Sequence, residues 1–486
     1  MPSEPTASAA SSAAFDILCE PSELSTRNTD DVAKRQDGLI DWIKGMLMHS
    51  FVLGNQTESY VTTMKYIETL IKEHRIKGNS SRLKTLVPTV DMFHTELHLV
   101  EAFNMYNAKY SVTSRKHVPP TFHEIRHILN LSQLLAINVH LKMVSFDGDQ
   151  TLYSDGGNFE EKSGLSYQII ELIRAGINVV VITAANYEHN GSMYELRLQG
   201  LLRRFAKARL SPAEIARFHV MGGECHYLLR AQLTPGDTIA HLIAVAHEVW
   251  QSGEGGKNCP MSWPISARES FLDVAEASFR ASQSELKIRA RILRKKTSVG
   301  MIPGGEAMVK VFPGGHGKDK IKSEILDEVA LRAIEDIAKI KSDLIFPYCV
   351  FNGGRDCWVD VGTKGVAAKC LQSYFHVTPG ECIHIGDQFL AIGNDISTRA
   401  VCATVWIETP KETYKILDHV LRFSLGKDKM ERAAAAAAAD DLDRVAQPAN
   451  GGVPSLSLDV PEVPAVRPKV MNVYTGEMMS APATPK

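Results

Sequence analysis

The 486-residue sequence contains no long hydrophobic run, no CxxC pair among its eight cysteines and no excess of charge of either sign. The missing CxxC pairs disfavour a zinc knuckle and a dense disulfide framework, so we expect reduced thiols. No apolar run reaches the roughly 20 residues that a membrane helix needs. A net charge of −2 provides no basic field that would attract nucleic acid or an acidic membrane. We therefore expect neither nucleic acid nor a membrane as a partner.

The N-terminal sequence also lacks the features of a secretory signal. The segment MPSEPTASAASSAAFD has neither a positively charged start nor an apolar core. Hydrophobic residues make up 44% of the chain and charged residues 23%, which is ordinary for a globular protein, and the length allows about two or three domains. These features predict a cytoplasmic protein of enzyme size.

Both ends of the chain differ in composition from the middle. Residues 1–29 begin with a Ser- and Ala-rich stretch, and residues 426–486 combine a run of alanines with a Pro-, Val- and Ser-rich tail. Neither has a periodic apolar face, so we predict that both are disordered. Residues 30–135 repeat apolar side chains at helical spacing, as in Leu39 and Ile43. This pattern predicts a helical N-terminal domain.

From residue 141 the pattern alternates between strands and helices. Apolar strands are predicted at 141–146, 178–182, 382–385 and 401–407, with a helix at 164–175 after the first of them. The strand at 178–182 is an uninterrupted β-branched run, as expected for a strand buried on both faces. This order predicts an α/β fold with a doubly wound parallel sheet, whose ligands bind at the carboxyl ends of the strands.

A long insertion separates the second and third of these strands. It contains predicted amphipathic helices at 237–250, 267–293 and 319–341 and is too long to be a loop. We therefore predict a separate α+β cap domain, placed to act as a lid. The predicted boundaries are 136–185 and 350–425 for the core and 186–349 for the cap.

The most informative segment is VSFDGDQTLY at residues 144–153. An apolar strand leads into Asp147 and Asp149, and Thr151 follows. Because side chains alternate along a strand, the two carboxylates would point the same way, and like charges held that close repel unless a cation or a proton relieves them. One carboxylate could then act as a nucleophile while the other moves a proton. The alternative is a solvated acidic turn.

Further polar signals follow predicted strands later in the chain. In chain order they are Thr183, Lys364, Asp387 and the pair Asn394 and Asp395. Each has an ordinary alternative: a strand-end hydroxyl, a solvated lysine, a turn aspartate and a helix cap. Lys369 competes with the earlier lysine as the functional one. The occurrence of all these signals in one order favours a single catalytic site over separate coincidences.

This order of residues resembles the four-motif signature of the haloacid dehalogenase-like (HAD) phosphohydrolases, in which a cap is inserted between the second and third motifs. The resemblance implies a HAD-like core that binds Mg²⁺ through Asp147, Asp387 and Asp149, the last through a carbonyl near that position. Asp147 would attack phosphorus and form an aspartyl-phosphate. Asp149 would protonate the leaving oxygen and later deprotonate water.

The remaining motif residues would hold the substrate or support the site. By the same resemblance, Thr151, Thr183 and Lys364 contact the substrate, together with Asp149, and the cation of the lysine neutralises phosphoryl oxygens. Asn394 and Asp395 would hold the metal ligands in position without binding the ion themselves.

Longer segments narrow the resemblance to the fungal and protozoan IMP-specific 5′-nucleotidases. They are FDGDQTLYSDGG (146–157), VVVITAANY (179–187), FNGGRDCWVDVGTKGVAAK (351–369) and IHIGDQF (383–389). This family implies hydrolysis of IMP to inosine and phosphate, a Mg²⁺ requirement, activation by ATP and a homotetramer, with the N-terminal domain serving regulation or assembly. A HAD-type sugar-phosphate phosphatase or phosphomutase, and an inactive scaffold, stay open as alternatives.

Selection of the base depends on the hydrogen-bonding edge of hypoxanthine. A carboxylate that accepts from N1–H would disfavour AMP, whose N1 is an acceptor. Candidates are Asp155, Asp356 and Asp360, and the family's use of the stretch after the first motif favours Asp155. Trp358 could also reach the ligand. The alternative is that these are ordinary loop acids and a core tryptophan.

A basic segment in the helical N-terminal domain is the best candidate for a regulatory ATP site. SRKHVPPTFHEIRH at residues 114–127 gathers cationic and titratable side chains. Given the family's response to ATP, we predict Arg115, Lys116, Arg126 and His127 as phosphate contacts. The alternative is a solvated basic face.

Overall fold

The computed structural model divides the chain into two compact units, Met1–Ala136 with Phe389–Ile392, and Ile137–Gln388 with Gly393–Lys486. The residues that it describes are 37–52, 56–137, 140–187, 191–251, 260–305, 310–312, 314–316, 320–340, 346–426, 469–471 and 478–480. The predicted lead at 1–29 and most of the predicted tail at 426–486 lie outside them. Within the tail, β12 (Lys469–Met471) and β13 (Met478–Ser480) form an antiparallel pair, so the prediction of disorder is wrong for these residues.

The first unit is helical, as the apolar spacing predicts. Its elements are α3 (Gly38–Val52), α4 (Gln56–Lys77), η1 (Gly78–Ser80), α5 (Arg82–Leu86), α6 (Leu99–Tyr110), η2 (Val112–Ser114) and α7 (Phe122–Ile137). The core of the unit forms where α4 packs against α3 and α6, and Tyr60 meets Phe103 edge to face with ring centroids 6.0 Å apart. A capping box precedes α7, because Thr121 N donates to Glu124 Oε2 (2.9 Å) and Glu124 N donates to Thr121 Oγ1 (3.3 Å).

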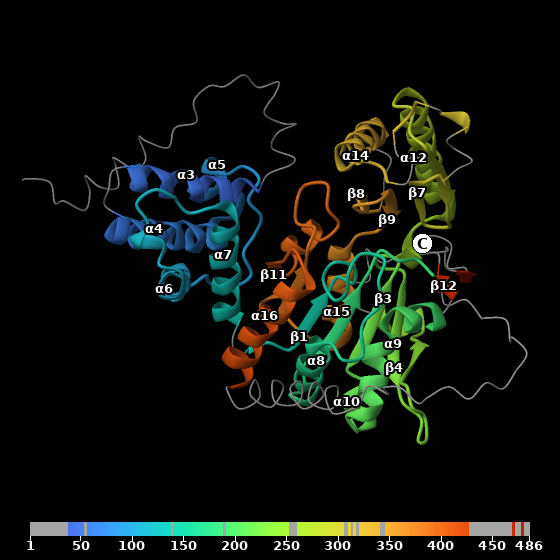
Figure 1. The fold of residues 1–486 in the computed structure, drawn as a ribbon, viewed down its shortest axis with the longest axis horizontal. Helices are drawn as coiled ribbons and strands as arrows, with labels where there is room; N and C mark the ends of the chain where they lie inside the picture. The colour runs from blue at the N-terminus through green and yellow to red at the C-terminus, as the bar shows by residue number, and fades with distance from the viewer. Residues whose placement is uncertain are drawn as a thin grey trace, which may run out of the picture. The chain divides into compact units, whose positions relative to one another are not determined.

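The second unit is built on a seven-stranded sheet with the order β11-β10-β1-β2-β3-β4-β5 (Figure 1). The strands are β1 (Met143–Phe146), β2 (Asn178–Ile182), β3 (Phe218–Gly222), β4 (Tyr227–Gln232), β5 (His241–Ala244), β10 (Cys382–Gly386) and β11 (Ala403–Trp406). The first three, with β10 and β11, run parallel, while β4 and β5 are antiparallel to their neighbours. The predicted doubly wound α/β sheet is therefore confirmed, with β1 between β10 and β2 at the point where the strand order reverses.

Helices connect the parallel strands, and two more follow the last of these strands, β11. They are α8 (Gly164–Arg174), α9 (Gly191–Lys207), α10 (Pro212–Ile215), α15 (Lys364–Phe375) and α16 (Pro410–Val420), with the short helices η7 (Pro379–Glu381), η8 (Ile396–Ala400) and η9 (Leu421–Leu425). Ser163 caps α8 by accepting from Leu165 N, and α8 packs against β2 and α16. Apolar side chains of the central strands, such as Val144 and Val180, are fully buried.

The cap has its own four-stranded antiparallel sheet, in the order β6-β7-β9-β8. Its elements are η5 (Pro260–Ser262), α12 (Ile265–Glu285), β6 (Ala290–Arg294), β7 (Ser298–Pro303), α14 (Ser323–Ala338), β8 (Tyr348–Asn352) and β9 (Cys357–Val361). The two long helices pack against each other and against this sheet (Figure 1). The cap is therefore α+β, as predicted.

The predicted cap boundaries need correction at both ends. Segment 186–245 was assigned to the cap, but it contributes β3, β4 and β5 to the core sheet. The reason is that β3, which follows the second motif in the chain, pairs in parallel with β2. Segment 348–361, assigned partly to the core, forms two strands of the cap sheet. The predicted helix at 237–250 is instead β5 followed by the short α11 (His247–Trp250), and the helix predicted at 267–293 ends at Glu285.

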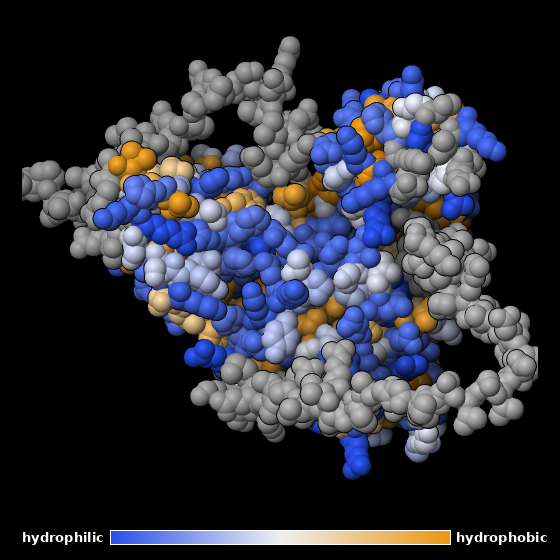
Figure 2. Space-filling view, in the orientation of Figure 1, coloured by the Kyte–Doolittle hydropathy of each residue, from blue (hydrophilic) through white to orange (hydrophobic). Residues whose placement is uncertain are grey.

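The side of the molecule that Figure 2 shows is mainly hydrophilic, with hydrophobic side chains scattered over it. In the second unit the large apolar side chains gather inside, where Trp250, Phe271 and Phe279 are almost completely buried. Among the helices that the structure describes, none combines the length and the apolar character needed to cross a membrane.

A buried histidine in the core sheet should make folding stability depend on pH. Burial lowers the pKa of His219 on β3 from 6.5 to about 4, and its ring lies edge-on to Phe375. Between these values the unfolded chain binds a proton that the folded chain does not, so stability is lost as pH falls from 6.5 towards 4. From pH 7 to pH 5 we expect a loss of about 2 kcal/mol from this residue alone.

Denaturant unfolding at pH 7 and pH 5 measures this effect. The His219→Phe variant should lose about 2 kcal/mol less than the wild type between the two pH values. His117→Phe, at an exposed bend of the first unit, is the control and should keep the wild-type dependence. Equal pH dependence in all three proteins would contradict a neutral His219 in the folded state.

Candidate active site

Several predicted site residues meet at the carboxyl edge of the core sheet. Asp147 follows β1, Thr183 follows β2 and Asp387 follows β10. Asp147 N donates to Ile385 O (2.9 Å) and Thr183 N donates to Met221 O (2.9 Å), so both residues continue the hydrogen bonding of their strands. Carboxylate oxygens of Asp147, Asp387 and Asp395 lie within 4.8 Å of one another. The edge therefore concentrates acidic groups at one point.

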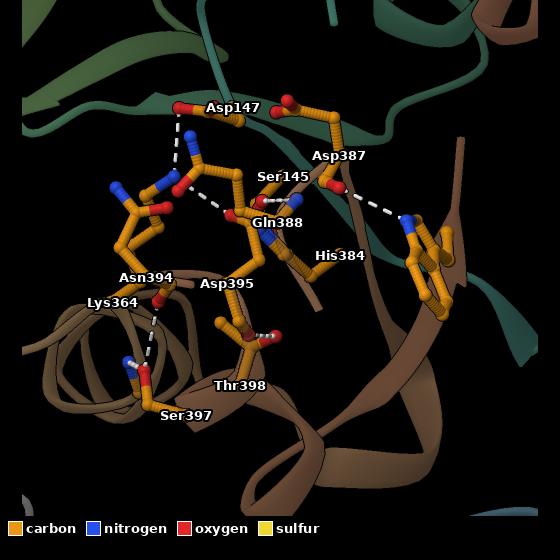
Figure 3. Close-up of polar contacts among 12 residues, drawn as sticks. Ser145, Asp147, Lys364, His384, Asp387, Gln388, Asn394, Asp395, Ser397 and Thr398 are labelled. Atoms are coloured by element: carbon orange, nitrogen blue, oxygen red, sulfur yellow. Dashed lines mark hydrogen bonds and ion pairs between the residues drawn. The ribbon is translucent and has the colours of Figure 1, made fainter. Parts of the chain in front are cut away.

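Lys364 supplies the positive charge at this edge. It is the first residue of α15, and its Nζ lies 2.7 Å from Asp147 Oδ1 and 2.7 Å from Asp395 Oδ1 (Figure 3). Burial opposes a charge on Lys364, but the two carboxylates outweigh it and raise its pKa above the ordinary value. The competing candidate, Lys369, is exposed on the same helix. The structure therefore brings Lys364 to the motif aspartates.

Asp395 is held by donors on both oxygens. Oδ1 accepts from Lys364 and lies 2.9 Å from His384 Nε2, while Oδ2 accepts from Gln388 N at 2.8 Å (Figure 3). Ser145 Oγ lies 2.9 Å from the other ring nitrogen of His384. Burial opposes ionisation of Asp395, but Lys364 and His384 hold its pKa below the usual range. Its oxygens are already occupied, so Asp395 orients the lysine and is a poor direct metal ligand.

The other two acids of the cluster have fewer donors, because Asp147 is paired with Lys364 alone and Asp387 Oδ1 has no donor. Burial raises the pKa of Asp147 to about 6, with Lys364 opposing and Asp395 adding to the rise. Burial and the Asp147 carboxylate raise the pKa of Asp387 well above its usual range. Buried acceptor oxygens at Asp387 Oδ1, Gln388 Oε1 and Asn394 Oδ1 have no hydrogen-bond donor. A cluster of acidic side chains, with nearby oxygens that have no hydrogen-bond donor, suits a hard divalent cation and its waters.

Asp149 lies apart from this cluster. Its Oδ1 accepts from Gly156 N (2.9 Å) and from Arg197 Nη2 (2.5 Å), and Arg197 comes from α9. The metal contact predicted at this position is a carbonyl, and the Asp149 carboxylate, which accepts from these two donors, is not among the clustered acids. Only its backbone carbonyl stays a predicted ligand.

The two predicted threonines have different surroundings. Thr183 lines the cleft, and its Oγ1 accepts from Ala185 N (3.1 Å), which leaves the hydroxyl proton available to a phosphoryl oxygen. Thr151 is fully buried, and its carbonyl accepts from Thr413 Oγ1 of α16 (2.7 Å). The prediction that Thr151 contacts the substrate is therefore corrected: it joins the first motif to α16.

Glu224 is a site residue that the sequence motifs do not include. It lies in the turn between β3 and β4 with a left-handed backbone (φ 62°), and its N–H donates to Thr183 O (3.0 Å). Its Oε1 accepts from Asn394 Nδ2 at 3.1 Å. Burial raises the pKa of Glu224 well above its ordinary value, although Lys364 opposes the rise. Glu224 thus fixes the orientation of the Asn394 amide group. The oxygen of that amide, Oδ1, has no hydrogen-bond donor.

A cleft opens over the acids between the core and the cap. The residues that line it are Asp147, Asp149, Asp155, Gly156, Thr183, Ala184, Ala185, Tyr187, Arg197, Lys295, Phe351, Gly353, Arg355, Asp356, Trp358, Gln388 and Asn394. The aromatic side chains and the cap acid Asp356 suit a ligand with a flat ring and polar edges.

The three aspartates predicted to contact the hypoxanthine base differ in their position relative to the cleft. Asp155 Oδ2 lies 2.5 Å from Arg355 Nε in an ion pair, which joins the core loop to the cap turn. Asp356 also lines the cleft, beside Trp358. Asp360 does not line it, and burial raises its pKa to about 7, with Lys295 opposing. The structure therefore disfavours Asp360 as a base contact.

The four predicted ATP contacts all lie in the first unit. Arg115 forms a two-bond pair with Glu124 (2.6 and 3.0 Å), and Arg126 is 1% exposed. Lys116 is exposed, and the ring of His127 stacks on Tyr106 with centroids 6.3 Å apart. The charge of Arg115 is thus already neutralised within the unit, while Lys116 faces solvent.

Most of the chain is similar to one family of nucleotidases. Residues 29–417 match the family model described as IMP-specific 5′-nucleotidase. A relative from Plasmodium falciparum (isolate 3D7), named IMP-specific 5′-nucleotidase 1, is 32% identical over 403 residues, which cover 83% of this chain and 87% of the relative. A relative of the same name from Eremothecium gossypii is 35% identical over 415 residues, covering 80% of this chain and 95% of the relative.

Solved structures show the same similarity. An IMP-bound, N-terminally truncated Plasmodium falciparum IMP-nucleotidase superposes with a TM-score of 0.72 at 32% identity, covering 82% of this chain and 100% of that one. An ATP-bound structure of the Plasmodium falciparum IMP-nucleotidase gives 0.69 at 32% identity, covering 82% of this chain and 88% of that one.

Proposed function

Since the chain belongs to the IMP-specific 5′-nucleotidase family, we propose that it hydrolyses IMP to inosine and phosphate through an aspartyl-phosphate on Asp147. The pairing of Asp147 with buried Lys364, beside Asp387, supports this most directly. A phosphate monoester dianion repels an anionic nucleophile, so its charge must be neutralised before attack. A carboxylate with a fixed cation at its side meets this requirement.

Mg²⁺ is the cofactor in this proposal. The ion would be held by Asp147, Asp387 and the carbonyl of Asp149. Oxygens of Asp387 and Asn394 that have no hydrogen-bond donor support this assignment. The bound ion would supply Lewis-acid neutralisation of the phosphoryl oxygens. Asp395 would contribute by holding Lys364 in place.

In the first step an oxygen of Asp147 bonds to phosphorus while the bond from phosphorus to ribose O5′ breaks. Lys364 Nζ and the Thr183 hydroxyl donate to phosphoryl oxygens. Protonated Asp149 gives its proton to O5′, so inosine leaves as a neutral alcohol. Asp147, Asp149 and Thr183 all line the cleft, and Lys364 Nζ lies 2.7 Å from Asp147 Oδ1, which supports this assignment of roles.

In the second step a water molecule attacks phosphorus and the bond to Asp147 breaks. Asp149 now takes the proton from that water, which restores its protonated form for the next cycle. The Asp147 carboxylate is regenerated and pairs again with Lys364. One side chain therefore serves as acid and then as base.

Base selection would come from the cap side of the cleft. Asp356 is the candidate to accept from N1–H of hypoxanthine, because it lines the cleft on the cap side together with Trp358. Trp358 offers an aromatic surface for the ring. AMP would be disfavoured, because its N1 is an acceptor and would face a carboxylate.

ATP activation and a homotetramer complete the proposal. The ATP-bound relative supports a nucleotide effector. Among the predicted contacts, exposed Lys116 is better placed for phosphate than Arg115, which is paired with Glu124, or Arg126, which is buried. The first unit would therefore carry the effector site.

A phosphate-release screen tests the proposed substrate. Nucleoside monophosphates and sugar phosphates are compared with and without Mg²⁺ and ATP, and we expect IMP to have the highest kcat/KM. A sugar phosphate with a higher kcat/KM would replace IMP as substrate. No release from any ester would indicate an inactive scaffold.

Removal of divalent metal should abolish turnover without unfolding the protein. After dialysis against EDTA we expect phosphate release at background and recovery on addition of Mg²⁺. Because protons compete with the cation for Asp147, whose pKa is raised to about 6, half-saturation should require more Mg²⁺ as pH falls towards that value. Full activity after chelation would contradict the metal assignment.

A further inference from the structure

A buried arginine outside the four motifs holds the proposed acid and base. The Arg197 side chain is 6% exposed, and its Nη2 lies 2.5 Å from Asp149 Oδ1. Gly156 N donates to the same oxygen at 2.9 Å. Both donors thus bind Oδ1, which leaves Oδ2 as the oxygen that can exchange a proton with a ligand in the cleft.

Arg197 is itself fixed by the elements around it. Its guanidinium lies over the Tyr153 ring, 5.0 Å from the centroid, and its carbonyl accepts from Phe159 N at 2.7 Å. One turn later, a Cβ on Gly200 would lie 2.3 Å from Phe159 O, so α9 packs directly against that backbone. These contacts join α9 to the segment after the first motif, and the arginine therefore keeps a constant position relative to Asp149.

We propose that Arg197 is a positioning residue that holds Asp149 Oδ1 so that Oδ2 faces the leaving oxygen and then the attacking water. The proposal rests on the function proposed above, in which Asp149 moves the proton. Holding a reacting group in one orientation raises the fraction of encounters in which proton transfer can occur. Loss of the arginine should therefore act on kcat more than on KM.

Two substrates separate this role from direct binding of phosphate. p-Nitrophenolate leaves as an anion, so formation of the aspartyl-phosphate from p-nitrophenyl phosphate needs no acid. Inosine is a poor leaving group and needs the proton of Asp149. Hydrolysis of the intermediate needs Asp149 as a base with either substrate.

The experiment compares Arg197→Met and Arg197→Lys with the control Arg204→Met in full-length protein. Arg204 lies on the same helix, with its guanidinium 4.7 Å from the centroid of the Tyr167 ring. For Arg197→Met we expect kcat on IMP to fall about 100-fold with KM changed less than about threefold. Arg197→Lys should recover part of this loss, and Arg204→Met should behave as wild type.

Rapid mixing with p-nitrophenyl phosphate supplies the second readout. Arg197→Met should release about one p-nitrophenolate per site in a burst and then turn over slowly, because only the second step needs Asp149. The burst also shows that the variant site is folded. Loss of the burst in a variant that melts like wild type would mean that Arg197 binds the phosphoryl group, and the proposal would be wrong.

A double variant tests the dependence on Asp149 itself. In an Asp149→Asn background, Arg197→Met should cause no further loss on IMP, because the group that it positions is gone. A multiplicative further loss would overturn the proposal. If IMP is not the substrate, the same comparison applies to the alkyl phosphate that the screen identifies, so a wrong substrate and a wrong role for Arg197 give different results.

Discussion

Replacing Asp147 with asparagine should lower kcat for phosphate release from IMP by about 10⁴-fold or more. The amide keeps the size of the side chain and can accept from Lys364, but it cannot form the acyl phosphate with the substrate phosphorus. Asp147 is buried, and burial raises its pKa to about 6, so the loss of its charge should not unfold the protein. Steady-state phosphate release and thermal melting measure the two parts of this prediction.

Asp237→Asn is the matched control, because Asp237 is exposed in the turn between β4 and β5. It should keep wild-type kcat and melting temperature. Equilibrium binding of IMP to Asp147→Asn should persist, since the remaining phosphate contacts are intact. Turnover near the wild-type rate would remove Asp147 as the nucleophile.

Replacing Lys364 with methionine should reduce both activity and stability. The variant leaves Asp147 and Asp395 as buried carboxylates without their shared cation, which typically costs about 3–5 kcal/mol. Loss of a fixed donor to the phosphoryl group should lower kcat/KM by about 10²–10³-fold. Denaturant unfolding and steady-state kinetics give the two values.

The stability cost should shrink as pH falls. Lys364 lowers the pKa of Asp147, so without it that carboxyl group takes up a proton at higher pH, which removes the uncompensated charge. Lys369→Met, on the exposed side of the same helix, should change stability by less than about 0.5 kcal/mol. A cost for Lys364→Met that does not depend on pH would contradict the charge-based explanation.

The regular parts of the fold could be predicted because their patterns are local. The β-branched run of β2 and the apolar approach of β1 predict buried parallel strands, and both were found. In the same way, the spacing of apolar residues predicts the N-terminal helices. In each case the periodicity lies within a single element.

The extension of the core sheet could not be predicted in this way. β3 is a five-residue strand that follows two helices, and its assignment depends on pairing with β2, more than thirty residues earlier. The segment around β5 and α11 has enough apolar residues to suggest a helix, but pairing with β4 selects a strand at its start. Such tertiary pairing overrides local propensity.

The motif residues of the site could be predicted because each directly follows a strand or begins a helix at the same sheet edge. Asp147, Thr183, Lys364 and Asp387 all have this position. Arg197 and Glu224 do not, because their roles come from a helix face and from a left-handed turn. His384 lies inside a strand, where a polar side chain among apolar neighbours is the one signal that could have identified it.

The central claim is that Asp147 carries the phosphoryl group during turnover. Rapid acid quench of the Asp149→Asn variant during reaction with p-nitrophenyl phosphate and Mg²⁺ should trap this species, since the variant lacks the base for its hydrolysis. Borohydride reduction followed by peptide mass spectrometry should then find homoserine at position 147. Phosphate release in one step with no modified residue, or reduction at a different carboxylate, would contradict the account.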